Sequence, residues 1–186
     1  MEGLTAAYIG RFQPFGKHHR KLVQFIDSRP DVKGIVIVKG GSQWNDKNYD
    51  PYSSPDRNPF TADECCGMIN LSLKSRIKKP YKIVRVADTK SKMTDPLWKE
   101  WVEAVIFAVG DRDFLVYVNE PHTVRAFETA GIQCRSFLIE NLGPRATIIR
   151  DKIAFEPEDE WSKYVDPEVA GYLKRINASE RVRRLL

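Results

Sequence analysis

The sequence predicts an α/β fold in which an open parallel β-sheet carries helices on both faces. Short apolar runs rich in β-branched residues recur between residues 4 and 139, and segments with helical spacing of apolar residues separate most of them. Nearly continuous apolar strands are typical of a sheet that is buried on both faces. Their alternation with helices predicts that the strands run parallel.

Five apolar runs are the expected strands of this sheet. In chain order they span residues 4–9, 34–39, 81–87, 114–119 and 133–139. Each run is short, and polar residues, glycine or proline follow it and end it.

The segments between these runs are the expected helices. Residues 18–27 carry Leu22, Val23, Phe25 and Ile26 at helical spacing. Further helices are expected at residues 61–74, 96–109 and 123–130. Ligands of such sheets bind beyond the carboxyl ends of the strands, so we expect a functional site there, with the turn after the first strand contributing to it.

The organisation of the chain predicts an α/β domain at residues 1–142 and a C-terminal helical subdomain at residues 143–186. Helices within the subdomain are expected at residues 147–155, 159–164, 167–176 and 179–186. Residues 40–59 lack apolar periodicity and predict a long loop beside the end of the second strand. Its aromatic residues belong either to a lid over the ligand or to an ordinary surface loop; they are Trp44, Tyr49 and Tyr52.

Composition and charge narrow the class of protein. Of 186 residues, 42% are hydrophobic and 30% charged, and no apolar run approaches the roughly 20 residues that cross a bilayer. No signal peptide is evident, and three cysteines without metal spacing fit a reducing compartment, so we expect a cytoplasmic protein with no membrane partner. The net charge of +5 suits anionic ligands. The basic clusters at residues 74–82 and 181–184 are not interleaved with a run of aromatic residues that could stack bases, so we expect solvated faces and not a nucleic-acid surface.

Residues 10–20, Gly-Arg-Phe-Gln-Pro-Phe-Gly-Lys-His-His-Arg, are the most informative segment. They connect the first expected strand to the first expected helix. Backbone N–H groups at a helix amino terminus lack partners inside the helix, and the helix dipole favours negative charge there. Five side chains add further donors around this point: Arg11, Lys17, His18, His19 and Arg20. The turn therefore predicts a phosphate-binding site.

The same segment resembles the opening of the nucleotidyltransferase superfamily with the H-x-G-H signature, and specifically the archaeal type of nicotinamide-mononucleotide adenylyltransferase. Further matches follow in the expected order along most of the chain. They are Asn58-Pro59-Phe60-Thr61-Ala62, Pro96-Leu97-Trp98, Val116-Tyr117 through Asn119, Val124-Arg125, Phe127 to Gly131, and Ala146-Thr147-Ile148-Ile149-Arg150, which resembles the late S-x-T-x-I-R motif. The resemblance implies a Rossmann-like sheet with the C-terminal subdomain completing the phosphate site.

The resemblance implies an activity as well: transfer of an adenylyl group from ATP to nicotinamide mononucleotide (NMN), giving NAD and pyrophosphate. The nucleophile is then the 5′-phosphate of the mononucleotide, which is already anionic at neutral pH, so no general base is required. Catalysis reduces to alignment and to stabilising negative charge on phosphate oxygens. Mg²⁺ is implied as a companion of ATP, with no metal ligands expected from the chain, and a homo-oligomer is implied by the archaeal family.

The resemblance also implies roles for individual residues. The expected catalytic residues, which hold the ATP phosphates, are His19, Arg11 and Arg150. The expected nucleotide-binding residues are Gly10, Phe12, Lys17, His18, Asn119 and Thr147. Trp98 is expected to stack on the nicotinamide ring and Asp88 to lie near the same pocket. Guanidinium groups suit this task because their planar fork matches phosphate oxygens with two parallel bonds.

Two positions depart from the signature. Gly16 stands where the first histidine is expected, and His18 where the glycine is expected. If residues 16–19 are helical, the side chains of positions 16 and 18 point about 200° apart around the helix axis. His18 is therefore not expected to take the place of the missing imidazole directly. Loss of one preorganised donor costs roughly 10² to 10³ in rate. We expect Lys17 or His18, reoriented by the flexibility of Gly16, to restore part of the charge. Cys65 marks a second departure, where the family often has arginine.

Three alternatives stay open at this point. A nucleotidyltransferase of the same fold could use CTP or a different phosphorylated acceptor. A noncatalytic nucleotide-binding homologue could keep Arg11, His19 and Arg150 while Gly16 and His18 record lost chemistry. Binding of nucleic acid through the basic helices predicts affinity that falls steeply with added salt.

Overall fold

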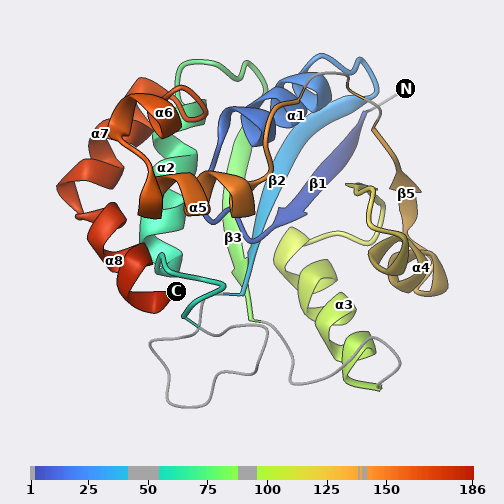
Figure 1. Cartoon of the computed structure of the whole chain (residues 1–186). Helices are drawn as coiled ribbons and strands as arrows, with labels where there is room; N and C mark the ends of the chain where they lie inside the picture. The colour runs from blue at the N-terminus through green and yellow to red at the C-terminus, as the bar shows by residue number, and fades with distance from the viewer. Residues whose placement is uncertain (1–2, 42–54, 88–95, 138, 140–141) are drawn as a thin grey trace.

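The computed structural model of the chain describes residues 3–41, 55–87, 96–137, 139 and 142–186 (Figure 1). Its centre is a sheet of parallel strands in the order β3-β2-β1-β4-β5. The strands are β1 (Leu4–Gly10), β2 (Val32–Gly40), β3 (Tyr81–Val86), β4 (Phe114–Tyr117) and β5 (Gln133–Arg135). This order confirms the predicted open parallel sheet.

The strand order fixes where a ligand crevice can form. The chain adds β2 and β3 on one side of β1 and then returns to place β4 on its other side, so Tyr8 of β1 lies between Ile37 of β2 and Tyr117 of β4. The order of the strands therefore reverses at β1 and β4, and sheets of this kind bind ligands at such a reversal, outside the carboxyl ends of the strands. The turn after β1 opens there.

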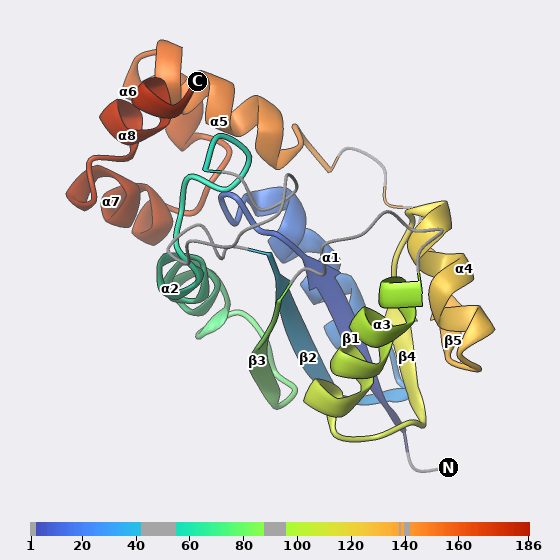
Figure 2. The ribbon, with the colours of Figure 1, turned by 90° about the horizontal axis from the view of Figure 1, so that it is seen from below.

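Helices cover both faces of the sheet, as predicted. Alternate β1 residues point to opposite faces, so Ala6 and Tyr8 join one core and Ala7 the other. The first core takes the apolar faces of α1 (Lys17–Asp27) and α2 (Ala62–Leu73). The second core takes those of α3 (Pro96–Val109) and α4 (Pro121–Thr129). Figure 2 shows the two pairs of helices on either side of the strands.

The C-terminal helices pack beside α1 and α2, above the carboxyl ends of the strands (Figure 2). They are α5 (Ala146–Phe155), α6 (Glu158–Ser162), α7 (Pro167–Arg175) and α8 (Ala178–Leu185). Their buried residues, among them Ile149, Ile153, Trp161 and Leu173, belong to the same core as the first face of the sheet. Within the described part of the chain, no helix has both the length and the apolar character needed to cross a bilayer.

The loop predicted at residues 40–59 is only partly described. Trp44, Tyr49 and Tyr52, and with them the lid hypothesis, lie outside the described residues. The end of the loop is well packed, because Asn58, Pro59 and Phe60 are buried. This buried end brings the residues before α2 against the turn that follows β1.

Candidate functional site

The turn after β1 owes its shape to Gly10 and Phe12. Phe12 has φ +54°, and its ring covers the Cα of Gly10, where a Cβ would lie 2.6 Å from Phe12 Cε1. Only glycine tolerates such an approach. Phe12 is 2% exposed and packs between the rings of Tyr8 and Phe15. The structure therefore gives Gly10 and the Phe12 side chain a supporting position beneath the site.

Gln13 ties this turn to two other parts of the chain. Its buried amide group donates to the carbonyl of Phe60 (2.8 Å) and accepts from the N–H of Phe60 (3.0 Å). The backbone carbonyl of Gln13 accepts a hydrogen bond from Arg150 Nη1 (3.1 Å). No role for Gln13 was predicted from the sequence, although a buried polar side chain usually has a hydrogen-bond partner.

Three arginines from three separate elements converge at the turn. Burial lowers the pKa of Arg150 in α5, and the nearby guanidinium groups of Arg11 and Arg57 lower it further, whereas Asp151 and Asp56 oppose this effect. A guanidinium remains protonated at neutral pH in any protein environment, so the site keeps its positive charge. Arg11 and Arg150 therefore lie near the same turn, and Arg57, which was not predicted from the sequence, is a third cation there.

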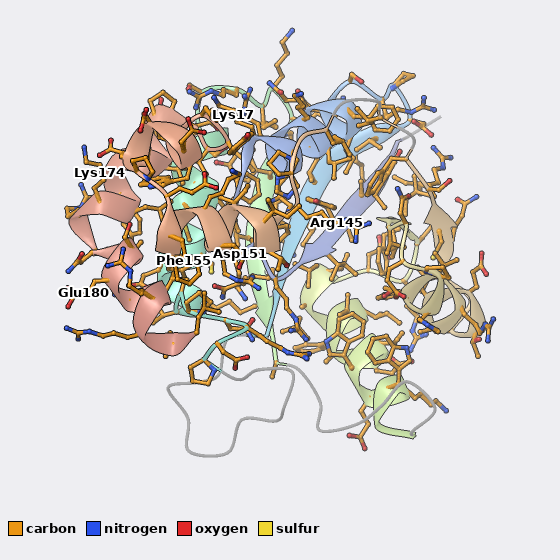
Figure 3. All side chains as sticks on the ribbon, viewed as in Figure 1. Lys17, Arg145, Asp151, Phe155, Lys174 and Glu180 are labelled. Carbon is orange, nitrogen blue, oxygen red and sulfur yellow. The ribbon has the colours of Figure 1, made fainter. Side chains whose placement is uncertain are left out.

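α5 brings Arg150 to this place. It lies across the end of the sheet, with Arg145 at the end nearer the strands and Phe155 at the opposite end (Figure 3). Ile149 is fully buried and packs against the start of α1, so the next residue, Arg150, is directed toward the turn after β1. Arg145 is the N-cap residue of α5, so Thr147 lies within the first turn and is exposed.

His19 is held as a neutral hydrogen-bond donor. Its Nδ1 accepts the backbone N–H of Gly16 (3.1 Å), and its ring stacks on Phe15 at 5.2 Å between centroids. Burial and the neighbouring His18 keep the pKa of His19 well below its ordinary value. Because Nδ1 accepts a bond, the neutral ring carries its proton on Nε2. His19 therefore offers an Nε2–H without a charge.

His18 differs from what the rotation argument predicted. Gly16 has φ −93° and ψ 170°, so it is an extended N-cap residue and the helical rotation of about 100° per residue does not start there. The His18 ring folds back beside Gly16 and lies 3.7 Å from the His19 ring between centroids. Burial lowers the pKa of His18 to about 4. The expectation that His18 restores positive charge is therefore wrong, because the ring is neutral at pH 7.

Two of the other side chains that were expected to bind phosphate instead contact the segment of the C-terminal helices. Lys17 Nζ donates to the carbonyl of Lys163 (2.8 Å), and the Lys17 N–H donates to the carbonyl of Tyr164 (2.8 Å). Arg20 Nε lies 3.1 Å from Oδ2 of the buried Asp166. The prediction that Arg20 joins the phosphate donors is wrong: its guanidinium anchors α7 to α1.

Asn119 and Trp98 lie at the carboxyl side of the sheet. Each already contacts another part of the protein: Asn119 through hydrogen bonds and Trp98 through ring stacking. The Asn119 amide group donates to the carbonyl of Phe137 (2.6 Å) and accepts the Phe137 N–H (2.8 Å). The Trp98 ring stacks on Trp101 with centroids 4.6 Å apart and an angle of 17°. One face of Trp98 is thereby covered. Asp88 lies outside the described residues.

The described residues contain no group of three or more His, Cys, Asp or Glu side chains that could hold a metal ion. The site consists instead of guanidinium groups and a neutral imidazole donor at the carboxyl end of β1, where the strand order reverses. Such donors suit the oxygens of a polyphosphate. Fold and site together define a nucleotide-binding α/β protein with a Rossmann-like sheet.

Comparison with known proteins identifies the family. The chain is 34% identical over 182 residues to the nicotinamide-nucleotide adenylyltransferase of Thermoplasma acidophilum, covering 97% of this chain and 90% of that protein. It is 31% identical over 184 residues to the protein of the same name from Archaeoglobus fulgidus, covering 97% and 96%. No protein-family model matches the chain. The chain belongs to the nicotinamide-nucleotide adenylyltransferase family.

Solved structures agree on the fold. The chain is similar to a bifunctional NMN adenylyltransferase/ADP ribose pyrophosphatase from Francisella tularensis complexed with AMP and a Mn ion, with a TM-score of 0.72 at 19% identity. This similarity covers 99% of the present chain and 52% of that one, so the chain spans about half the length of the bifunctional protein. A NadR protein in complex with NAD and AMP-PNP has a TM-score of 0.65 at 16% identity.

Proposed function

We propose that this chain transfers AMP from ATP to nicotinamide mononucleotide, giving NAD and pyrophosphate. The relatives at about 30% identity that carry the name of this activity support the proposal. The observation that carries it is the grouping of Arg11, Arg57 and Arg150 at the turn after β1, the same turn that leads into the helix start carrying the neutral donor His19.

The proposed mechanism asks the protein for alignment and charge stabilisation. The phosphate of the mononucleotide attacks the α-phosphorus of ATP, the bond to the β-phosphate oxygen breaks, and pyrophosphate leaves with the electron pair. Charge grows on the oxygens during this step, and Arg150, Arg11 and Arg57 face it with fixed positive groups. The Nε2–H of His19 donates to a phosphate oxygen. No proton has to be removed from the nucleophile.

The acceptor and the metal have their own proposed positions. In this proposal the face of the Trp98 ring opposite Trp101 stacks on the nicotinamide, while Asn119 and Thr147 complete the nucleotide site. Mg²⁺ is proposed as the metal; bound together with ATP, it would neutralise charge on the triphosphate. The described residues fit this role because Asp56 and Asp151 lie near enough to Arg150 to affect its pKa, and Mg²⁺ commonly binds through substrate phosphates and water with one or two carboxylates.

One incubation tests the proposal. Pure protein with ATP, Mg²⁺ and nicotinamide mononucleotide is expected to form NAD and pyrophosphate in equal amounts, measured by chromatography and a phosphate assay. Replacing ATP by CTP, or the acceptor by another phosphorylated nucleoside, tests a different specificity. Tight ATP or NAD binding without product would contradict the proposal and favour a noncatalytic nucleotide-binding protein.

The cellular setting is also proposed. We place the protein in the cytoplasm, which its three free cysteines support, and fractionation of cells that express it tests this. We propose a homo-oligomer, supported by the exposed Ile148 and Phe155, which lie two turns apart on α5; light scattering on the purified protein tests this. Nucleic acid is not proposed as a ligand, because Arg76 and Arg181 form ion pairs with Glu168 and Glu64.

A further inference from the structure

The exchange of side chains between positions 16 and 18 has a structural consequence. A Cβ placed on Gly16 would lie 2.7 Å from His18 Nδ1, 2.9 Å from His18 Cε1 and 2.8 Å from Ile149 Cδ1. Contacts this short do not occur between a real Cβ and its neighbours. The His18 ring therefore fills the space that any side chain at position 16 would need.

The same ring forms one wall around His19. His18 and His19 have centroids 3.7 Å apart, and the other sides of His19 meet Phe15 (5.2 Å) and Phe12 (5.1 Å). The backbone N–H that fixes the His19 tautomer comes from Gly16, the residue that His18 covers. A displaced Gly16 would thus lose both its contact with His18 and its bond to His19.

The His18 ring contacts Gly16 and the His19 ring. Its Nδ1 is buried without a hydrogen-bond partner among the described residues. The ring also lines a cavity of about 130 Å³ together with Lys17, Lys21 and Tyr164, and Arg11, Arg57 and Arg150 are not among the described residues that line it. His18 can therefore act on the phosphate site through His19, the site residue whose ring it touches.

We propose that Gly16 and His18 form a coupled pair that positions His19: the His18 ring fills the space beside Gly16 and packs on the His19 ring, holding it where Gly16 N–H bonds Nδ1 and Nε2–H is free to donate. The inference rests on the proposed function, because His19 matters only if it meets phosphate. His18 is a positioning residue, and the property that holds His19 in place is the flat shape of the His18 ring.

A set of variants tests the pair, read by two methods. Steady-state kinetics with ATP, Mg²⁺ and nicotinamide mononucleotide gives kcat and KM. The ¹⁵N spectrum of the imidazoles gives the tautomer of His19, and the chain has only three histidines to assign. Two matched controls are available: Gly171→Ala on α7, where a Cβ would meet nothing within 4 Å, and His122→Ala on the exposed start of α4.

The pair predicts a specific pattern. Gly16→Ala and His18→Ala each lower kcat by about tenfold to 10²-fold, because a misplaced donor loses its alignment, and each gives His19 as a mixture of tautomers. In the His18→Ala background, adding Gly16→Ala costs much less than it does alone. His18→Phe keeps the ring and so keeps kcat within about threefold, the His19 tautomer and the unfolding midpoint. Both controls behave like the wild type.

Two results would overturn the pair. If His18→Phe loses as much activity as His18→Ala, the imidazole acts through its nitrogen atoms and not through its shape. If Gly16→Ala leaves kcat and the His19 tautomer unchanged, the two positions are not coupled. A wild-type protein that forms no NAD would overturn the proposed function instead, and the tautomer of His19 in the variants would still test the pair, since that reading needs no turnover.

Discussion

Arg57 contributes charge from a loop that a sequence motif would not single out. It lies near Arg150 and Arg11. The buried segment 58–60 follows it directly and is fixed by the two hydrogen bonds between the Gln13 amide group and the Phe60 backbone. Loops positioned by a rigid framework often carry binding residues. In the proposed function, Arg57 is one of three cations that face the triphosphate.

We predict that Arg57→Ala lowers kcat/KM for ATP by about 10- to 100-fold, because a hydrogen bond to a charged group is worth roughly 1.5 to 3 kcal/mol. The expected change appears in steady-state kinetics with ATP varied. Arg112→Ala is the matched control, since Arg112 pairs with Glu103 on the surface (2.7 Å). Equal rates for the two variants would remove Arg57 from the site.

The two adjacent histidines predict a pH dependence of stability. The pKa of His18 is about 4 in the folded chain, against 6.5 for an exposed histidine. Between these values the unfolded chain binds a proton that the folded chain does not, so the free energy of unfolding falls as pH drops from 6.5 to 4. The His18 contribution is at most about 3 kcal/mol, and His19 acts in the same direction.

His18→Phe isolates this effect. Urea unfolding at pH 7 and pH 5 is expected to show a smaller loss of stability in the variant than in the wild type, because the variant has one fewer group to protonate. Carboxylates such as Asp31 and Glu120, whose pKa values are lowered, act below about pH 4.5 and are the same in both proteins. An equal loss in both proteins would contradict a buried neutral His18.

A site residue could be predicted from the sequence where the chemical type of its side chain suggests a role. It could not be predicted where its role depends on backbone conformation or on contacts with distant segments. Arg11 and His19 were predicted because cationic and imidazole groups at a strand-to-helix turn indicate phosphate whatever the local geometry, and Arg150 because its segment resembles a motif of the family. The position of the His18 ring could not be predicted, because it depends on the extended backbone of Gly16. Arg57 and Gln13 were missed because their importance comes from contacts with segments distant in the sequence.

The helices and strands themselves were predicted closely, since apolar periodicity sets them. All five expected strands and eight expected helices occur, with ends that move by a few residues. The fifth strand ends at Arg135 and not at residue 139 because its partner β4 ends at Tyr117, the residue paired with Arg135. α4 starts at Pro121, two residues early, because Glu120 caps it by accepting the N–H groups of His122 and Thr123.

One buried carboxylate at the start of α7 holds this helix against α1 and α2. Asp166 accepts a bond from Ser72 Oγ of α2 (2.5 Å) and lies 3.1 Å from Arg20 Nε of α1. We predict that Asp166→Ala lowers the free energy of unfolding by about 3 kcal/mol, because it leaves a largely buried guanidinium without its partner. Urea unfolding measures the change.

The control lies two residues further along the same helix. Glu168 pairs with Arg76 at 3.0 Å, but its side chain is 46% exposed, and exposed ion pairs contribute no more than about 1 kcal/mol. Glu168→Ala is therefore expected to have a small effect. If both variants lose the same free energy, the Asp166 network is not the anchor of α7.

The C-terminal helices share one hydrophobic core with the sheet. Their buried residues share a core with α1, α2 and one face of the strands, and Tyr164 provides the acceptor for the first N–H of α1. The site depends on this union, because Arg150 comes from α5 and Arg11 from the turn after β1. We therefore expect folding and formation of the site to be coupled.

Truncation tests this union. We predict that a chain lacking residues 146–186 does not fold cooperatively, since removal of α5 to α8 exposes the apolar faces of α1 and α2 to water. Circular dichroism during urea unfolding is expected to show a single transition for the full chain and none for the truncated one. A sharp transition in the truncated chain would mean that the α/β part folds independently.

The most direct measurement for the phosphate site is calorimetric titration of the full chain with ATP and Mg²⁺, repeated on Arg150→Ala. If three guanidinium groups and His19 hold the triphosphate, the wild type binds ATP and the variant binds it at least about tenfold more weakly. No heat on addition of ATP, or the same dissociation constant for both proteins, would contradict the account.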